Sequence, residues 1–266
     1  MTVFSFQRFQ VRQDRAAMKI CTDAALFGAM SPIARGDRVL DIGAGTGLLS
    51  LMAAQMGATH ITAVELDGEA YREAEANFCA SPWSQQLTAV CGDIRDFARE
   101  DAGGYDVIVT NPPFFSGQSK PSVVSRAIAR HTGQLPHSSL IAAVARLLGN
   151  EGLFYVLLPV QRVAEFSASA RDRGLRPLYR VDYRGFSHTR PNVSALVFRK
   201  DLPGLFMTRE LIIYRSQRVY SAEAEHYLAP YLLRFARPGN SCAIGCPSRS
   251  PPPGEPLGHA TGGDSG

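Results

Sequence analysis

The stretch that decides the fold is Arg38-Val39-Leu40-Asp41-Ile42-Gly43-Ala44-Gly45-Thr46-Gly47, which leads into the apolar segment Leu48 to Met56. An apolar run that stops at a glycine-rich turn and opens a helix predicts a buried strand, a tight turn and a helix. Glycines let the backbone turn sharply and approach a ligand, and the helix N-terminus offers free N–H groups. The spacing G-x-G-x-G differs from the G-x-G-x-x-G of dinucleotide sites, and Asp41 would repel a pyrophosphate. The stretch therefore favours a cationic ligand.

Strand and helix patterns alternate along the rest of the chain. Further strands are predicted at 61–66, 87–91, 105–109, 152–158, 176–183 and 194–199, and further helices at 16–34, 69–79, 135–148 and 161–173. This alternation is the signature of a doubly wound α/β fold with a mostly parallel, seven-stranded sheet. The last two strands have no helix between them, so we expect an antiparallel hairpin at one edge.

The predicted sheet divides the chain into three regions: an N-terminal segment at 1–37, the α/β domain at 38–235 and a tail at 236–266. The tail is dense in proline, glycine and serine, so it cannot bury a core and is expected to be disordered. It holds Cys242, Cys246 and His259, which are too few and too poorly spaced for a metal site, so no metal is predicted.

The composition is that of a soluble globular protein. The chain has 266 residues, 45% of them hydrophobic and 20% charged, with a formal net charge of +4. The mildly basic balance permits an anionic partner such as RNA without requiring one. Five cysteines without a disulfide framework indicate reduced thiols. The N-terminus lacks a signal peptide, and no window approaches the roughly 18 apolar residues of a membrane span. We therefore expect a cytoplasmic protein with no membrane partner.

Three successive predicted strands each end in an acidic residue, namely Asp41, Glu65 and Asp93. Parallel strands bring their carboxyl ends to one edge of the sheet, where open α/β sheets bind ligands. Glu65 is placed to accept hydrogen bonds from ribose hydroxyls, and Asp93 from an adenine amino group. Acids at strand ends are also common as solvated helix caps, so each alone is weak evidence. Together they describe a nucleoside with an ammonium group and little negative charge, which S-adenosylmethionine fits and NAD fits poorly.

The fourth strand along the chain ends in Asn111-Pro112-Pro113-Phe114. The prolines have no backbone N–H to donate, and they push Asn111 toward extended geometry. An amide side chain, a free carbonyl and an aromatic ring are thereby predicted at the ligand-binding edge. The alternative is an ordinary turn that ends the strand.

These motifs resemble those of class I S-adenosylmethionine-dependent methyltransferases that carry an N-P-P-[FY] motif. More narrowly, the chain resembles the bacterial tRNA1(Val) adenine-37 N6-methyltransferases over about residues 4–235. The residues that carry the resemblance are 9–11, 18–23, 40–49, 63–67, Asn77, 81–83 and 111–114. Among them, the glycine motif and 111–114 are specific for the superfamily, and segments 19–23 and 81–83 point to the narrower family.

The resemblance implies a role for each motif. The counterparts of Asp41, Gly43, Gly45, Glu65 and Asp93 hold the cofactor, and segment 1–37 covers it with Thr22 and Asp23. Read without the resemblance, Thr22 and Asp23 form a helix cap. Asn111 and Pro112 would accept hydrogen bonds from the exocyclic amino group, while Phe114, after Pro113, would stack on the extruded base. We expect no general base and a monomer.

The implied tRNA substrate also calls for an RNA-binding surface. The long, basic segment 116–135, with Lys120, Arg126 and Arg130, is predicted to be a substrate lid, or alternatively a solvated surface helix. Other candidate phosphate contacts lie near the edge hairpin, namely Arg180, Arg184, His188 and Arg190. Two other functions stay open: methylation of guanine N2 in rRNA, and a non-catalytic cofactor-binding subunit of the same fold.

Overall fold

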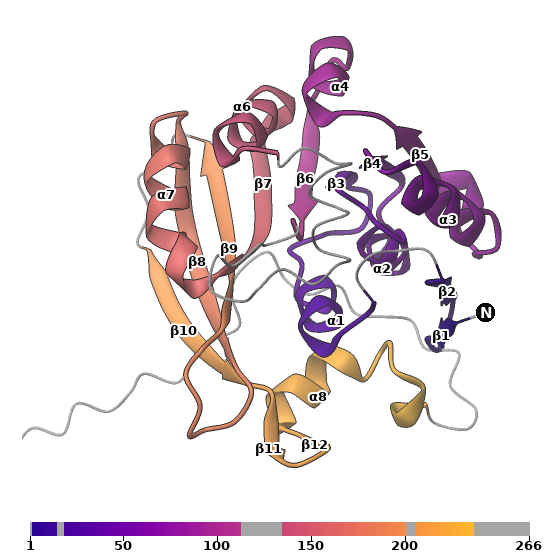
Figure 1. Cartoon of the computed structure of the whole chain (residues 1–266), viewed down its shortest axis with the longest axis vertical. Coiled ribbons are helices and arrows are strands. Elements are labelled where there is room, and N and C mark those ends of the chain that lie inside the picture. Colours follow the sequence, from indigo (N-terminus) through magenta and orange to yellow (C-terminus); the bar gives the residue numbers. More distant parts are fainter. Residues whose placement is uncertain (1, 15–18, 113–134, 201–205, 237–266) are drawn as a thin grey trace, which may run out of the picture.

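The computed structural model describes residues 2–14, 19–112, 135–200 and 206–236, and its central element is an eight-stranded sheet (Figure 1). The strand order is β10-β8-β9-β7-β6-β3-β4-β5. In chain order these strands are β3 (Arg38–Ile42), β4 (His60–Glu65), β5 (Leu87–Cys91), β6 (Tyr105–Thr110), β7 (Leu148–Pro159), β8 (Leu175–Arg184), β9 (Val193–Lys200) and β10 (Met207–Ile212). The predicted C-terminal tail lies outside the described residues, apart from Ala236.

The topology confirms the doubly wound α/β fold, with parallel strands from β7 to β5 and an antiparallel β8–β9 pair. The structure adds an eighth strand, β10, which runs parallel to β8 at the edge. Sequence patterning misses this strand because Thr208, Arg209 and Glu210 interrupt its apolar alternation, and only Leu211 is buried.

Helices cover both faces of the sheet. One face carries α1 (Thr22–Ala29), α2 (Leu48–Met56), α3 (Gly68–Cys79) and α8 (Ala222–Leu228). The other carries α4 (Ile94–Glu100), α6 (His137–Leu147) and α7 (Val163–Arg171). Short 3-10 turns occur at η1 (Ser84–Gln86), η2 (Val160–Arg162) and η3 (Leu233–Phe235), and two small hairpins form from β1 (Val3–Ser5) with β2 (Gln10–Arg12) and from β11 (Tyr214–Ser216) with β12 (Val219–Tyr220).

Each face of the sheet has its own hydrophobic core, because successive side chains on a strand point to opposite faces. On β7, Tyr155 packs in the core beneath α1 and α2, whereas Phe154 and Val156 pack in the core beneath α6 and α7. Tyr155 stacks on Phe27 of α1 with ring centroids 4.1 Å apart. Full burial of a side chain such as Phe154 or Val156 stabilises the folded state by about 1.5–3 kcal/mol. Because helices cover both faces of the central strands, the sequences of these strands are almost continuously apolar.

Helix α1 begins later than predicted and without the predicted cap. Its N-cap residue is Cys21, and no side chain caps its first turn, so the prediction of a Thr22–Asp23 cap is wrong. Other helices do have capping side chains: the Asp67 carboxylate accepts hydrogen bonds from the backbone N–H groups of Glu69 and Ala70. Thr22 and Asp23 are therefore available for contacts outside the helix.

The N-terminal hairpin β1–β2 packs into the same core as the sheet. Phe6, Phe9 and Val11 are buried there, and the Gln7 amide donates hydrogen bonds to the carbonyls of Ala229 (2.6 Å) and Leu232 (2.9 Å). The described part of segment 1–37 thus shares the core of the α/β fold, while the boundary at residue 37 stays a prediction.

A buried amide ties the N-terminal hairpin to the glycine turn. Asn77 of α3 is 2% exposed. Its side-chain oxygen accepts a hydrogen bond from the Arg12 N–H (2.9 Å), and its nitrogen donates to the carbonyls of Arg12 (3.0 Å) and Thr46 (2.9 Å). One side chain therefore joins three segments that are distant in the sequence.

Replacement of this amide should destabilise the protein. Asn77→Ala leaves the buried Thr46 carbonyl and the partly buried Arg12 N–H and carbonyl without this partner, so we expect the free energy of unfolding in urea to fall by about 2 kcal/mol. Asn192→Ala, at an exposed asparagine, is the matched control and should change it by less than about 0.5 kcal/mol. Equal effects of the two substitutions would contradict the structural role of Asn77.

Candidate functional site

The candidate site forms where two parallel strands, β3 and β6, leave the sheet together. Ile42 pairs with Thr110 across these strands, and the buried Thr110 hydroxyl donates a hydrogen bond to the Ile42 carbonyl at 2.8 Å. The residues that follow them, Gly43 and Asn111, therefore leave the sheet at the same position along the two strands. From β3 the chain crosses to β4 on one side, while β6 lies on the other. Such a switch point is where open α/β sheets bind ligands.

The glycine turn adopts backbone geometry that other residues avoid. Gly43, Gly45 and Gly47 have φ angles of 70°, 56° and 80°, in the left-handed region that favours glycine. A Cβ atom at Gly47 would lie 2.3 Å from the Phe78 ring, whereas one at Gly43 or Gly45 would meet nothing within 4 Å. Gly47 is thus needed for close packing against Phe78, whereas the space beside Gly43 and Gly45 is open.

Glu65 is held in place at the end of β4 by two backbone groups. Its carboxylate accepts one hydrogen bond from the Gly45 N–H (2.8 Å) and another from the Asp67 N–H (2.9 Å). The side chain is half-buried beside the glycine turn. Each carboxylate oxygen has further lone-pair capacity, so Glu65 can accept more hydrogen bonds without losing these two.

Asp41 lies beneath the glycine turn and is fully buried. One carboxylate oxygen accepts hydrogen bonds from the Ser50 hydroxyl (2.7 Å) and the Ser50 N–H (3.1 Å). The other, Oδ1, is buried and has no hydrogen-bond partner in the part of the chain that the structure describes. Burial raises the pKa of Asp41 to about 7, and the charge of Glu65 adds to the increase. A buried acceptor at a raised pKa is stabilised by a nearby cation or donor.

Asp93 follows β5 and caps helix α4. Its carboxylate accepts a hydrogen bond from the Arg95 N–H (2.8 Å) and pairs with the Arg95 guanidinium, with Nε 3.0 Å from each oxygen. These contacts lower the pKa of Asp93. In the structure Asp93 is thus a helix cap, and its contact with an adenine stays a prediction.

Thr22 and Asp23 lie at the start of α1 and face tyrosines from the other end of the chain. The Thr22 hydroxyl is 2.9 Å from the Tyr214 hydroxyl. Asp23 is half-buried, and burial raises its pKa. Burial also raises the pKa of Tyr214, and the charge of Asp23 contributes to that increase. Sequence reasoning misses Tyr214 because no motif or spacing links β11 to α1.

The acceptor motif is described only in part. Asn111 and Pro112 are half-buried and follow β6 directly. The remaining predicted residues of the motif and of the basic segment lie outside the described residues, namely Pro113, Phe114, Lys120, Arg126 and Arg130. The positions of Asn111 and Pro112 fit the predicted division of the edge into cofactor and acceptor halves.

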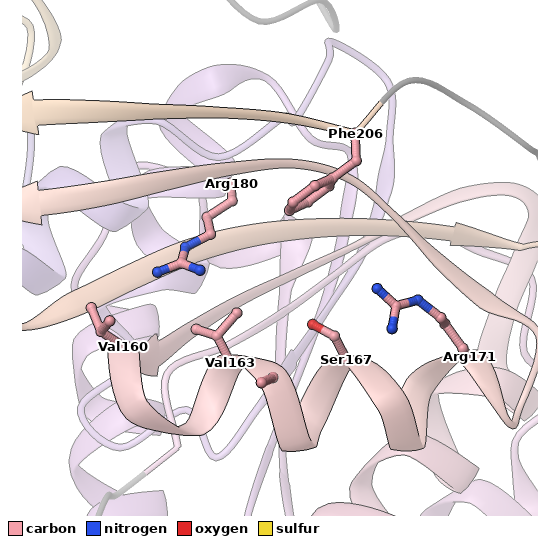
Figure 2. Close-up of a pocket in the computed structure, with 7 residues that line it drawn as sticks. Val160, Val163, Ser167, Arg171, Arg180 and Phe206 are labelled. Carbon is pink, nitrogen blue, oxygen red and sulfur yellow. The ribbon is translucent and has the colours of Figure 1, made fainter.

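A depression lies between α7 and the β8–β10 edge of the sheet (Figure 2). This α7 groove has a volume of about 320 Å³ and is lined by Val160, Val163, Ala164, Ser167, Arg171, Arg180 and Phe206. The Arg180 Nε lies 2.6 Å from the Asp182 carboxylate, so much of its charge is neutralised. The groove contains none of the strand-end residues of the candidate site.

Neither a metal centre nor a membrane span is found in the described ranges. No group of three or more histidine, cysteine, aspartate or glutamate side chains is arranged to hold a metal ion there. Among these same residues, no helix has the length and apolar character needed to cross a bilayer.

The chain is similar to known methyltransferases in sequence. Residues 21–153 match the family described as the methyltransferase small domain. A tRNA1(Val) (adenine(37)-N6)-methyltransferase from Shewanella halifaxensis is 37% identical over 235 residues, which are 86% of this chain and 96% of the relative. One from Dyadobacter fermentans is 44% identical over 172 residues, or 64% of this chain and 71% of the relative.

Solved structures confirm the fold. The crystal structure of a predicted O-methyltransferase from Agrobacterium tumefaciens superposes with a TM-score of 0.61 at 16% identity, and the match covers 77% of this chain and 94% of that one. At this identity the likeness bears on the fold alone.

The buried Asp41 carboxyl makes stability depend on pH. Its pKa of about 7 in the folded protein exceeds the usual 3.8, so between these values the folded state holds a proton that the unfolded state releases. Its contribution to the free energy of unfolding is therefore present below about pH 4 and lost as pH rises toward 7, at up to about 1.4 kcal/mol per pH unit.

Urea unfolding of the wild type and of Asp41→Asn from pH 4.5 to 7, a window set by the pKa of about 7, tests this. Because asparagine does not titrate, the stability of the wild type relative to the variant should fall as pH rises. A difference that does not change with pH would show that Asp41 titrates normally.

Proposed function

The chain belongs to the family of tRNA1(Val) (adenine(37)-N6)-methyltransferases, and we propose that it transfers a methyl group from S-adenosylmethionine to N6 of adenine-37 in tRNA1(Val). The observation that carries the proposal is the pairing of β3 with β6, which sets the glycine turn beside Asn111. A donor half and an acceptor half of one site are thereby adjacent. A non-catalytic binding subunit would have no need of both.

The residues of the donor half fit S-adenosylmethionine. A Cβ at Gly43 or Gly45 would meet open space, and Glu65 has spare acceptor capacity for ribose hydroxyls. Asp41 keeps a buried oxygen near the turn that pairs with no group in the described residues. The acidic character of this edge suits a cation and disfavours phosphate. When bound, the cofactor supplies an electrophilic methyl group carried on a sulfonium.

The acceptor half overcomes the weak nucleophilicity of the adenine amino group, whose lone pair is delocalised into the ring. The Asn111 side-chain oxygen and the Pro112 carbonyl accept hydrogen bonds from its two N–H groups. These bonds favour a tetrahedral nitrogen and direct its lone pair toward the methyl donor. Catalysis then rests on positioning and on polar groups already in place, without a strong general base or a metal. As the N6–CH3 bond forms, the S–CH3 bond would break and S-adenosylhomocysteine would leave, and the extra proton on N6 would pass to solvent water. The base must leave the anticodon-loop stack to reach these groups, and Phe114 stacks on it.

Thr22 and Asp23 complete the proposed donor half from the N-terminal side, and Asp93 from β5. The proposed partner is tRNA, contacted in part through Lys120, Arg126 and Arg130. A monomer acting in the cytoplasm, where tRNA is available, is the simplest form consistent with this activity.

Substitution of Asn111 should remove catalysis and leave cofactor binding in place. We expect Asn111→Ala to lower kcat on unmodified tRNA1(Val) transcript by about 100- to 1000-fold, the loss typical of one catalytic hydrogen-bonding group. The affinity for S-adenosylmethionine, measured by calorimetry, should stay within about threefold, because the donor half is intact.

Asn192→Ala, at an exposed asparagine, is the control and should keep wild-type kcat. Radiolabelled cofactor supplied with separated tRNA and rRNA identifies the substrate, and nucleoside mass spectrometry identifies the product. Labelling of rRNA alone, or N2-methylguanosine as the product, would overturn the proposal.

A further inference from the structure

A row of aromatic rings passes beside Thr22, one of the predicted site residues, and reaches the surface. The rings come from the β8–β9 loop, the β11–β12 hairpin and η3, and we call them the aromatic ladder: His188, Phe186, Tyr214, Tyr220 and Phe235. Neighbouring ring centroids lie 5.1–6.0 Å apart. The outermost ring is His188, which is exposed and stacks on Phe186 with an interplanar angle of 14°. The ladder therefore ends in an aromatic face turned toward solvent.

The middle ring of the ladder, Tyr214, contacts the proposed cofactor segment. Tyr214 bonds to Thr22 through their hydroxyl groups, 2.9 Å apart. In Figure 1, β6 points toward the end of the molecule where α1, α8 and the β11–β12 hairpin lie. The hairpin that carries two of the rings thus lies at the end of the molecule toward which β6 points.

The ladder is built rigidly. The Arg184 guanidinium donates hydrogen bonds to the carbonyls of Thr189 (2.7 Å) and Ser187 (2.8 Å) and pairs with Glu210 at 2.6 Å. The Tyr214 N–H donates to the Gly185 carbonyl at 2.9 Å, which joins the loop to the hairpin. Arg184 is therefore a structural residue of the loop and not a free phosphate ligand. A surface held this firmly loses little entropy when it binds.

The segments that carry the ladder are strongly basic. Residues 184–192, 214–221 and 233–236 contain five arginines and no aspartate or glutamate. Four of the five, Arg190, Arg215, Arg218 and Arg234, are exposed. The Arg234 guanidinium lies 5.1 Å from the centroids of the Tyr220 and Phe235 rings. Rings interleaved with arginines match single-stranded RNA, whose bases stack on aromatic faces while its phosphates pair with cations.

We propose that the aromatic ladder and its arginines bind unpaired anticodon-loop nucleotides of the tRNA, on the flank of the base that enters the site. This inference rests on the proposed function, because it takes the substrate to be tRNA. It assigns His188 and Phe186 to base stacking and Arg190 to a phosphate.

The first test measures tRNA affinity after removal of the outer rings. With fluorescently labelled, unmodified tRNA1(Val) transcript, Phe186→Ala/His188→Ala should raise Kd by about tenfold or more, as expected for lost base stacking. In the methylation assay KM for tRNA should rise similarly, while kcat at saturating tRNA stays within about twofold. Should the double variant fail to fold, Phe186→Leu, which keeps apolar volume without a ring, takes its place with the same expectation.

The matched control lies in the α7 groove. Phe206→Ala/Arg171→Gln removes an exposed phenylalanine and an arginine from that surface (Figure 2) and should leave Kd for tRNA within about twofold. Arg190→Gln should reduce the slope of log Kd against log salt concentration by about one phosphate contact, and Arg171→Gln alone should not.

The outcomes separate the two proposals. If the wild type methylates tRNA but the ladder variants bind it with unchanged Kd and KM, the ladder inference is overturned and the proposed function stands. If the groove variants lose affinity instead, the RNA lies on the other surface and the inference is likewise overturned. If the wild type neither binds nor methylates tRNA, the proposed function itself fails.

Discussion

The site depends on one constraint, the parallel pairing of β3 with β6. These strands are distant in the sequence, yet their register places Ile42 opposite Thr110. The Thr110 hydroxyl donates a hydrogen bond to the Ile42 carbonyl where the pairing of the two strands ends. A shift of one residue would turn Thr110 into the other face of the sheet and move Asn111 away from the glycine turn. Because both strands are buried on both faces, their apolar side chains fix the register. The core thus positions both reactive segments at the edge of the sheet.

Polar groups beneath and around the glycine turn hold it in place. The Gly43 N–H donates to the Val64 carbonyl, the Gly45 N–H to the Glu65 carboxylate, and the Thr46 carbonyl accepts from Asn77. Burial of these groups is tolerated because they are paired, and an unpaired one costs about 1–3 kcal/mol. Asp41 Oδ1 is the exception among them, because no group in the described part of the chain pairs with it. Its cost is consistent with a site that is completed by a positively charged ligand.

Much of this arrangement can be predicted from the sequence, because a motif that follows a predicted parallel strand must lie at the carboxyl edge of the sheet. The glycine turn, Glu65 and Asn111 lie where alternation of strands and helices predicts. Local pattern fails where tertiary contacts decide: β10 is stabilised as an edge strand despite its polar residues, and α1 begins at Thr22 without a side-chain cap. The contact of Tyr214 with Thr22 joins residues 192 positions apart, which no local pattern can predict. At Asp93 the sequence does not distinguish two roles, because an acidic residue after a strand is expected both for a helix cap and for a ligand contact.

The central claim is that the strand-end site methylates N6 of adenine-37. Mass spectrometry of tRNA1(Val) from cells lacking this protein tests it most directly, with complementation by the wild type and by Asn111→Ala. N6-methyladenosine at position 37 should disappear, return with the wild type and stay absent with the variant. Persistence of that nucleoside in the deletion strain, or its return with Asn111→Ala, would contradict the claim.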